Sequence, residues 1–149
     1  MISIGFRCWM DRFTFVVLTG SQDEPEIIEY NHIKIPQQNS RAEQLYWFKK
    51  EVHGILDKHS VVSGCFKATE PISKTKDLHR AEVEGVLQIA GISHPQKTII
   101  ESRIKSQLNK NTNARKAKYL DELLEGDLNK LKGANYNEAC LAALSGLPK

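Results

Sequence analysis

Apolar side chains alternate with polar or small ones along the first 35 residues, with the period of two that is typical of β-strands. Aromatic and β-branched residues, which favour strands, are common in these stretches. Strands are predicted at residues 2–6, 13–18 and 27–35. Turn-forming residues at 8–12 and 19–23 separate the three strands, and Pro36 ends the last one. The simplest arrangement of three such strands is an antiparallel meander.

The next stretch has the period of an amphipathic helix. Ser40 is a predicted N-cap, and Glu43 completes a capping box with it. Apolar residues then recur at spacings of three and four, which predicts a helix over 41–58. These residues are Leu45, Phe48, Val52 and Ile55.

A second helix is predicted over 77–90, between two short apolar strands. Asp77 is its expected N-cap and Gly91 its expected C-cap. Its apolar stripe consists of Val83, Val86, Leu87 and Ala90. The flanking strands are expected at 61–66 and 97–101, and two further helices at 114–124 and 137–147.

This order of elements predicts an α/β fold, in which a five-stranded mixed sheet with its first three strands antiparallel carries helices on both faces. No internal repeat or low-complexity linker interrupts the chain, so residues 1–149 are expected to form a single domain. No apolar run is long enough for a transmembrane helix, and the N-terminus has no basic region followed by an apolar stretch. We therefore expect neither a membrane partner nor a signal peptide.

Several short stretches match one known family in order and spacing. Two lysines, Lys105 and Lys116, lie eleven positions apart after the fifth predicted strand. The other stretches are the end of the first strand at 5–9, the small-residue strand at 61–66, the helical segment at 80–87 and the start of the last helix at 135–142. Together these features resemble the RuvC-type Holliday-junction resolvases, which belong to the ribonuclease H-like superfamily, over almost the full chain.

The resemblance implies a site in which carboxylates hold two Mg²⁺ ions across a scissile phosphate. In this sequence the family's positions fall on Arg7, near Ser63, on Asn135 and on Glu138. Only Glu138 is a carboxylate. Because a guanidinium is cationic at any relevant pH, Arg7 would repel Mg²⁺. We therefore expect no catalytic residue, no cofactor and no bound metal, with Glu138 as the one remaining candidate ligand.

Glu138 has two interpretations. It could form an ion pair with Arg7 across the former metal site and so fill the electrostatic role of the metal. Alternatively, it is a solvated residue in the first turn of a helix, where the helix dipole favours a carboxylate. A rebuilt metal site would need other acids near the strand ends. The nearest in sequence are Asp11, Glu70, Asp77, Glu82 and Glu84, and none is expected where the strand ends converge.

Positive charge is concentrated in one segment. The net charge is only +3, from 21 Lys and Arg against 18 Asp and Glu, but residues 103–118 contain six basic residues and no acidic one. Such a density of cations can contact phosphates in a salt-dependent way. The alternative is a solvated loop. The candidate nucleic-acid-binding residues are Arg103, Lys105, Arg115, Lys116 and Arg7, of which Lys105, Lys116 and Arg7 are expected to face one groove.

Cysteines and aromatic residues add smaller possibilities. Cys8, Cys65 and Cys140 have no metal-ligand or redox spacing, which favours a reduced, cytoplasmic protein. Cys8 beside Arg7 could be a nucleophile with a lowered pKa, or simply a small half-buried thiol. Possible stacking groups for bases are Trp9, Tyr46 and Trp47. The apolar cluster at 45–48 is too wide for one helical stripe, so part of it could meet a second subunit.

Three functions follow from these features. The first is a nuclease-fold protein that has lost metal catalysis and binds either nucleic acid, as branched or duplex DNA, or a protein partner. The second is an active structure-selective endonuclease with an atypical Mg²⁺ site. The third is a plain oligomeric structural protein, for example a homodimer, whose basic segment only faces solvent. The number of carboxylates at the strand ends favours the first.

Overall fold

The structure is a computed structural model, and it describes residues 1–37, 40–68, 78–103 and 135–149. Five strands form one sheet in the order β3-β2-β1-β4-β5. The strands are β1 (Ile2–Cys8), β2 (Arg12–Gly20), β3 (Pro25–Lys34), β4 (Ser63–Lys67) and β5 (Ile99–Arg103). The first three strands are antiparallel, whereas β4 and β5 run parallel to β1. The predicted mixed sheet with an antiparallel meander is therefore confirmed.

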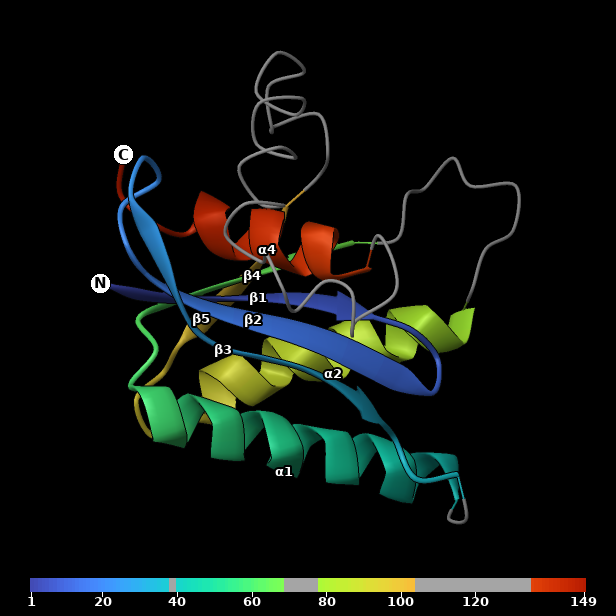
Figure 1. Ribbon diagram of the computed structural model, residues 1–149. Helices are drawn as coiled ribbons and strands as arrows, with labels where there is room; N and C mark the ends of the chain where they lie inside the picture. The colour runs from blue at the N-terminus through green and yellow to red at the C-terminus, as the bar shows by residue number, and fades with distance from the viewer. Residues whose placement is uncertain (38–39, 69–77, 104–134) are drawn as a thin grey trace.

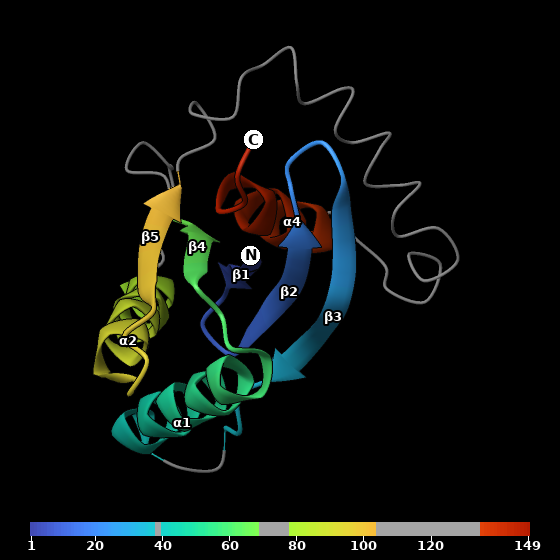
Figure 2. The ribbon, with the colours of Figure 1, turned by 90° about the vertical axis from the view of Figure 1, so that its left-hand side faces the viewer.

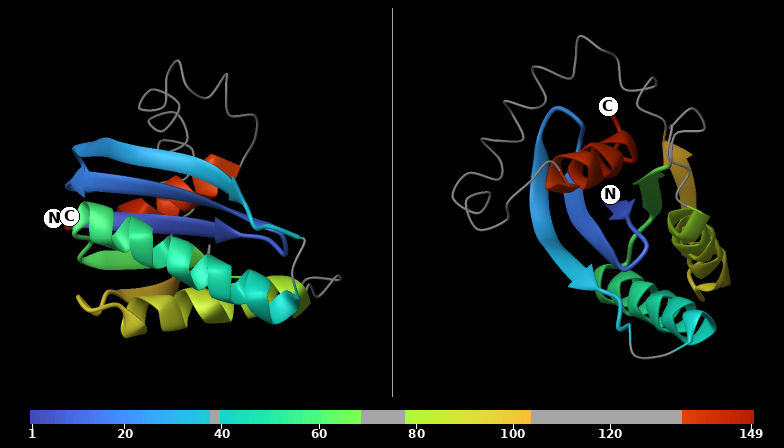
Figure 3. Two further views of the ribbon diagram at one scale, coloured as in Figure 1. Left: turned by 90° about the horizontal axis from the view of Figure 1, so that it is seen from below. Right: turned by 90° about the vertical axis from the view of Figure 1, so that its right-hand side faces the viewer.

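Helices cover both faces of the sheet, as predicted (Figures 1 and 2). Helices α1 (Arg41–His59) and α2 (Leu78–Ser93) lie side by side on one face, and α4 (Asn135–Ser145) lies on the other (Figure 3). None of the helices in the described part of the chain is long and apolar enough to cross a membrane. The helix expected at 114–124 and the cap expected at Asp77 lie outside the described residues.

Alternation along β2 builds a hydrophobic core on each face. Phe13, Phe15 and Val17 point toward α1 and α2, where they join a cluster that includes Phe6 and Phe48. The intervening residues of the same strand point toward α4. This second cluster contains Val16, Leu18, Tyr136, Ala139, Cys140, Ala143, Leu144 and Leu147. The central strands are thus buried on both sides, which fixes their register because a one-residue slip would exchange the two cores.

The start of α1 follows its sequence signal. The hydroxyl of Ser40 accepts a hydrogen bond of 3.3 Å from the backbone N–H of Glu43, which satisfies one of the free donors at the helix start. The helix ends at His59, and Ser60 follows in the left-handed conformation with φ 50°. The predicted N-cap is confirmed.

Several predicted boundaries differ from the observed ones, and two of the differences have a clear physical cause. Helix α2 continues past Gly91 to Ser93, so Gly91 is not a C-cap. A Cβ atom at this position would lie 2.3 Å from the carbonyl oxygen of Thr98, so the glycine is needed where the helix packs against the chain that leads into β5. That strand begins at Ile99 rather than at Lys97, because Lys97 adopts a positive φ of 46° in the preceding turn.

Gly5 determines how closely α4 approaches the sheet. A Cβ atom on Gly5 would lie 1.9 Å from the carbonyl oxygen of Ala139 and 2.3 Å from the amide nitrogen of Ala143. Helix and strand are therefore in backbone contact at this point, which only a glycine on β1 permits. The small residues of α4 support the same approach. This contact places the first turn of α4 over the carboxyl end of β1.

Candidate functional site

The carboxyl ends of β1 and β4 bring two cations together. Phe6 pairs with Phe66 in the parallel β1–β4 ladder, so the next residues, Arg7 and Lys67, lie level with each other. Side chains alternate along a strand, and Gly5 faces α4. Arg7, two residues further on, faces α4 as well. Both cations therefore lie beneath the first turn of the helix, which contains Glu138.

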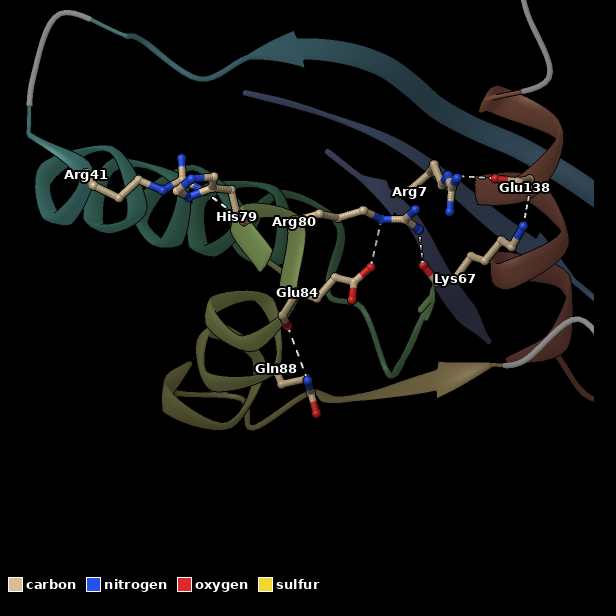
Figure 4. Close-up of polar contacts among 8 residues, drawn as sticks. All are labelled: Arg7, Arg41, Lys67, His79, Arg80, Glu84, Gln88 and Glu138. Carbon is tan, nitrogen blue, oxygen red and sulfur yellow. Dashed lines mark hydrogen bonds and ion pairs between the residues drawn. The ribbon is translucent and has the colours of Figure 1, made fainter. Parts of the chain in front are cut away.

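Glu138 bridges the two cations (Figure 4). Its Oε2 lies 2.7 Å from Nε of Arg7, and its Oε1 lies 2.5 Å from Nζ of Lys67. The side chains of Arg7, Lys67 and Glu138 are 15%, 17% and 23% exposed. Ion pairs at this depth are less screened by solvent and salt than surface pairs. The predicted Arg7–Glu138 ion pair is present, and we call the three residues the Arg7–Lys67–Glu138 triad.

A second ion pair adjoins the triad from α2. Nε of Arg80 lies 3.0 Å from Oε1 of Glu84, and its Nη2 donates to the carbonyl oxygen of Lys67 at 3.2 Å. Burial lowers the pKa of Arg7, the Glu138 carboxylate raises it, and Arg80 lowers it further. Arg80 is thus close enough for its charge to act on Arg7. Among the described residues, three cations and two carboxylates meet here, so these five side chains together carry one positive charge in excess.

Arg7 also has a hydrogen-bond donor that Glu138 does not use. A guanidinium carries five N–H groups, and Glu138 is paired with only one edge of it. Nη1 of Arg7 is buried and has no hydrogen-bond acceptor among the residues that the structure describes. A buried donor without an acceptor is costly, so an anion that reaches Nη1 would be stabilised.

The fourth-strand position inferred from the sequence was wrong. Ser63 pairs with Ser3, which lies four residues before Arg7 on β1. At a rise of about 3.3 Å per residue, Ser63 is therefore about 13 Å from the triad along the strand direction. Lys67 occupies the level of Arg7 instead. Lys67 lies one residue beyond the strand predicted at 61–66 and was therefore not among the predicted site residues. Arg80 was not among them either, because it comes from a helix on the opposite face of the sheet. The sequence signal that could have identified Lys67 is its position, as a cation directly after a predicted buried strand.

Of the other predicted site residues, two have a backbone that lies near the triad, and three lie outside the described part of the chain. Asn135 is the first residue of α4. Arg103 ends β5 and pairs with Lys67 in the β4–β5 ladder, so its backbone lies beside the triad. Lys105, Arg115 and Lys116 lie outside the described residues, and their convergence on Arg7 stays a prediction.

Other acidic residues do not gather at the triad as a metal site. Glu82 contacts His79 and Arg41, and Asp11 lies near Arg12 in the β1–β2 turn. Glu70 and Asp77 are outside the described residues. Among residues 1–37, 40–68, 78–103 and 135–149, no three His, Cys, Asp or Glu side chains lie close enough together to hold a metal ion. Glu84 is the one predicted acid that reaches the site, and there it is paired with Arg80.

Cys8 is not a nucleophile. Its side chain is fully buried in the core beneath α1 and α2, on the opposite face of β1 from Arg7. Burial raises the pKa of the Cys8 thiol, and Glu84 raises it further, while Arg80 and Arg7 oppose this only in part. Burial also raises the pKa of Cys140 to about 12. A thiol is reactive as its thiolate, so both groups are inert at neutral pH.

All three thiols should be protected in the folded protein. Cys8, Cys65 and Cys140 are each buried. We expect a thiol reagent such as Ellman's reagent at pH 8 to label the native chain about two orders of magnitude more slowly than the chain in guanidinium, where all three thiols react. Rapid labelling of one thiol in the native protein would show that its part of the core opens readily.

The predicted stacking aromatics have different surroundings. Trp47 packs partly against the core beneath α1, and Tyr46 is 63% exposed on the same helix. Trp9 lies in the β1–β2 turn, and the guanidinium of Arg7 lies 5.4 Å from the centre of its indole ring. Trp9 is therefore the aromatic residue that adjoins the triad. A second subunit at residues 45–48 stays a prediction.

Comparison with solved structures identifies the architecture. The RuvC protein of T. thermophilus, in complex with a Holliday-junction substrate, superposes with a TM-score of 0.78 at 12% sequence identity, covering 97% of this chain and 91% of that one. The fold is ribonuclease H-like. The fowlpox virus resolvase, in complex with Holliday-junction DNA, superposes with a TM-score of 0.61 at 12% identity, covering 97% and 95% of the two chains.

Sequence comparison adds nothing to this assignment. No protein-family model matches the chain, and no curated protein matches it. The ribonuclease H-like fold thus rests on the three-dimensional arrangement. At 12% identity the likeness to the two resolvases concerns the fold, and the chemistry of this chain has to be argued from its own side chains.

Proposed function

We propose that this protein binds DNA, branched or duplex, through the phosphate backbone and does not cut it. One observation carries the proposal: Arg7 and Lys67, at the carboxyl ends of two parallel strands, are both paired with Glu138. The resemblance to the RuvC-type resolvases would put metal ions at this end of the sheet, so a pair of cations here supports binding without cleavage. The two structural neighbours named above are resolvases bound to Holliday-junction DNA, which supports nucleic acid as the ligand class.

Electrostatics opposes a divalent metal at the triad. Both carboxylate oxygens of Glu138 already contact a cation. A doubly charged ion about 4 Å from one unit positive charge is repelled by about 8 kcal/mol at an effective dielectric constant near 20. The repulsion of the metal ion by two such cations is larger than its attraction to a single carboxylate. Since Mg²⁺ also gives up its water ligands reluctantly, the triad disfavours two-metal phosphodiester hydrolysis.

The same electrostatics favours a phosphate group. The triad and the Arg80–Glu84 pair carry one positive charge in excess, and Nη1 of Arg7 is a donor that lacks an acceptor among the described residues. Guanidinium groups match the geometry of phosphate oxygens, and charge-assisted hydrogen bonds of this kind are the stronger ones. A phosphodiester at this place would pair with Arg7 and Lys67 and would be held there intact.

The proposal is tested by combining a binding assay with a cleavage assay. We expect the purified protein to bind a labelled four-way DNA junction in EDTA, with an affinity that falls as salt rises. Lys67→Gln should weaken binding about tenfold and reduce the salt slope by about one, because one phosphate contact is lost. Lys50→Gln is the matched control, because it removes the same charge from α1 on the opposite face of the sheet.

Neither Mg²⁺ nor Mn²⁺ should produce cleavage of the junction. Metal-dependent cleavage that disappears in Glu138→Gln would contradict the proposal and support the endonuclease alternative. Absence of binding at about 50 mM salt, where phosphate contacts are strong, would contradict it as well. In that case a protein partner becomes the better hypothesis.

A further inference from the structure

The face of the sheet that carries the triad continues beyond the start of α4. Trp9 follows the end of β1 in the β1–β2 turn, and its indole ring adjoins the triad because the guanidinium of Arg7 lies 5.4 Å from the ring centre. Arg12 on β2 lies two residues before Thr14, which pairs with Arg7, so it faces the same side of the sheet. His32 on β3 lies two residues after Tyr30, which packs against the core cluster beneath α4. We call Trp9, Arg12 and His32 the aromatic ledge. It adjoins the triad through Arg7.

The contacts of the ledge hold an indole ring among polar groups. The guanidinium carbons of Arg7 and Arg12 lie 5.4 Å and 5.5 Å from the centre of the Trp9 ring. The imidazole of His32 meets the same ring edge-on at 5.9 Å, and a 2.7 Å hydrogen bond between Nδ1 and the hydroxyl of Thr14 orients it. Trp9 belongs to neither hydrophobic core cluster of the described residues. Among the described residues, the ring thus has two guanidinium groups and an imidazole as neighbours and lies outside both core clusters.

The charge of the ledge suits a nucleotide. Burial lowers the pKa of His32, and the neighbouring Arg12 and Lys34 lower it further while Asp11 opposes them, which favours the neutral imidazole beside the guanidinium groups. Arg12 is the more exposed of the two arginines: its side chain is 42% exposed, against 15% for Arg7, and its ion pair with Asp11 has an N–O distance of 4.0 Å. A surface pair of this length contributes little, so Arg12 can move off the ring at low cost.

We infer that the aromatic ledge stacks one unpaired base of the DNA whose phosphate is held by Arg7 and Lys67. This inference rests on the proposed function. The base takes the place of the Arg12 guanidinium on the indole ring, and Arg12 turns to a flanking phosphate. Stacking on an aromatic side chain contributes about 1–3 kcal/mol per base and needs an accessible base face, which the interior of a paired duplex does not offer. The ledge therefore selects branched or bulged DNA over continuous duplex.

Two tryptophans make the test direct. Trp9 and Trp47 are the only tryptophans of the chain, so Trp47→Phe leaves Trp9 as the sole indole fluorophore and Trp9→Phe leaves Trp47. The probes are a duplex whose two ends are closed by hairpin loops, and the same duplex with one unpaired thymine at its centre. In Trp47→Phe, the bulged probe should quench the emission in a saturable way and the continuous probe should not. In Trp9→Phe, neither probe should quench it.

A binding measurement gives the second readout. Trp9→Leu keeps an apolar side chain but removes the stacking surface, and it should weaken binding of the bulged probe about tenfold while leaving the continuous probe unchanged. Thermal unfolding of each variant confirms that it is folded. Equal weakening of both probes, or no quenching of Trp9 by a bulged probe that binds, would overturn the inference and leave the proposed function standing. If neither probe binds at about 50 mM salt, the proposed function fails and the inference fails with it.

Discussion

Gly5→Ala should destabilise the protein by about 3 kcal/mol, near the upper end of what overpacking a core costs. The added methyl group would lie 1.9 Å from the carbonyl oxygen of Ala139 and 2.3 Å from the amide nitrogen of Ala143. Both are backbone atoms, which cannot turn away as a side chain does, so α4 has to move off the sheet. Urea unfolding followed by circular dichroism measures the loss as a lower midpoint at an unchanged slope.

The same substitution should disconnect Glu138 from its cations, because the first turn of α4 moves with the helix. Cys140 on α4 should then become more reactive than in the parent protein, which reports the displacement locally. Gly54→Ala is the matched control: a Cβ atom there has nothing within 4 Å, and alanine is the better helix former by about 0.5–1 kcal/mol. If Gly5→Ala were as stable as its parent, the backbone contact between β1 and α4 would be wrong.

Glu138→Gln should change stability and DNA affinity in opposite directions. The substitution keeps the size of the side chain but removes the charge that compensates Arg7 and Lys67. Breaking a fully buried pair by removing one partner costs about 3–5 kcal/mol, and since these side chains are 15–23% exposed we expect about 2–3 kcal/mol. For a chain of this length, that corresponds to a fall in melting temperature of about 4–12 °C.

The DNA affinity of Glu138→Gln distinguishes a phosphate-binding site from a metal-binding site. With Glu138 neutral, both cations are available to phosphate, so junction DNA should bind about tenfold more tightly, with a salt slope steeper by about one. Glu43→Gln is the control, since Glu43 also lies in the first turn of a helix and loses the same dipole interaction, worth about 0.3–1 kcal/mol. Weaker DNA binding by Glu138→Gln would mean that the carboxylate itself supports the ligand, as a metal ligand does.

Much of the fold could be predicted because it depends on local periodicity. The alternation of apolar residues in 2–35 produced three strands with nearly the observed limits, and the Ser40 cap placed the start of α1 correctly. These signals are short in range, so each is complete within a few residues of sequence. The ends of elements were less accurate where a tertiary contact competes with a local signal. Gly91 has the residue type of a C-cap but serves a close contact with the backbone of Thr98.

By itself, the sequence determined that a cation, Arg7, and no acid directly follows its first predicted strand. It also indicated that Glu138 lies in the first turn of a helix of small residues, from which an ion pair with Arg7 could be hypothesised. Both conclusions need only residue type and position along the chain.

Only the tertiary structure decided which residues complete the site. Lys67 belongs to it, and Ser63 does not, because the register of the parallel β1–β4 pair sets Phe6 opposite Phe66. Parallel strands are joined by a long crossover, so no turn geometry in the sequence fixes their register. Arg80 reaches the carbonyl oxygen of Lys67 from a helix on the other face. These contacts follow from packing between segments far apart in the chain, and that packing brings two cations to one carboxylate.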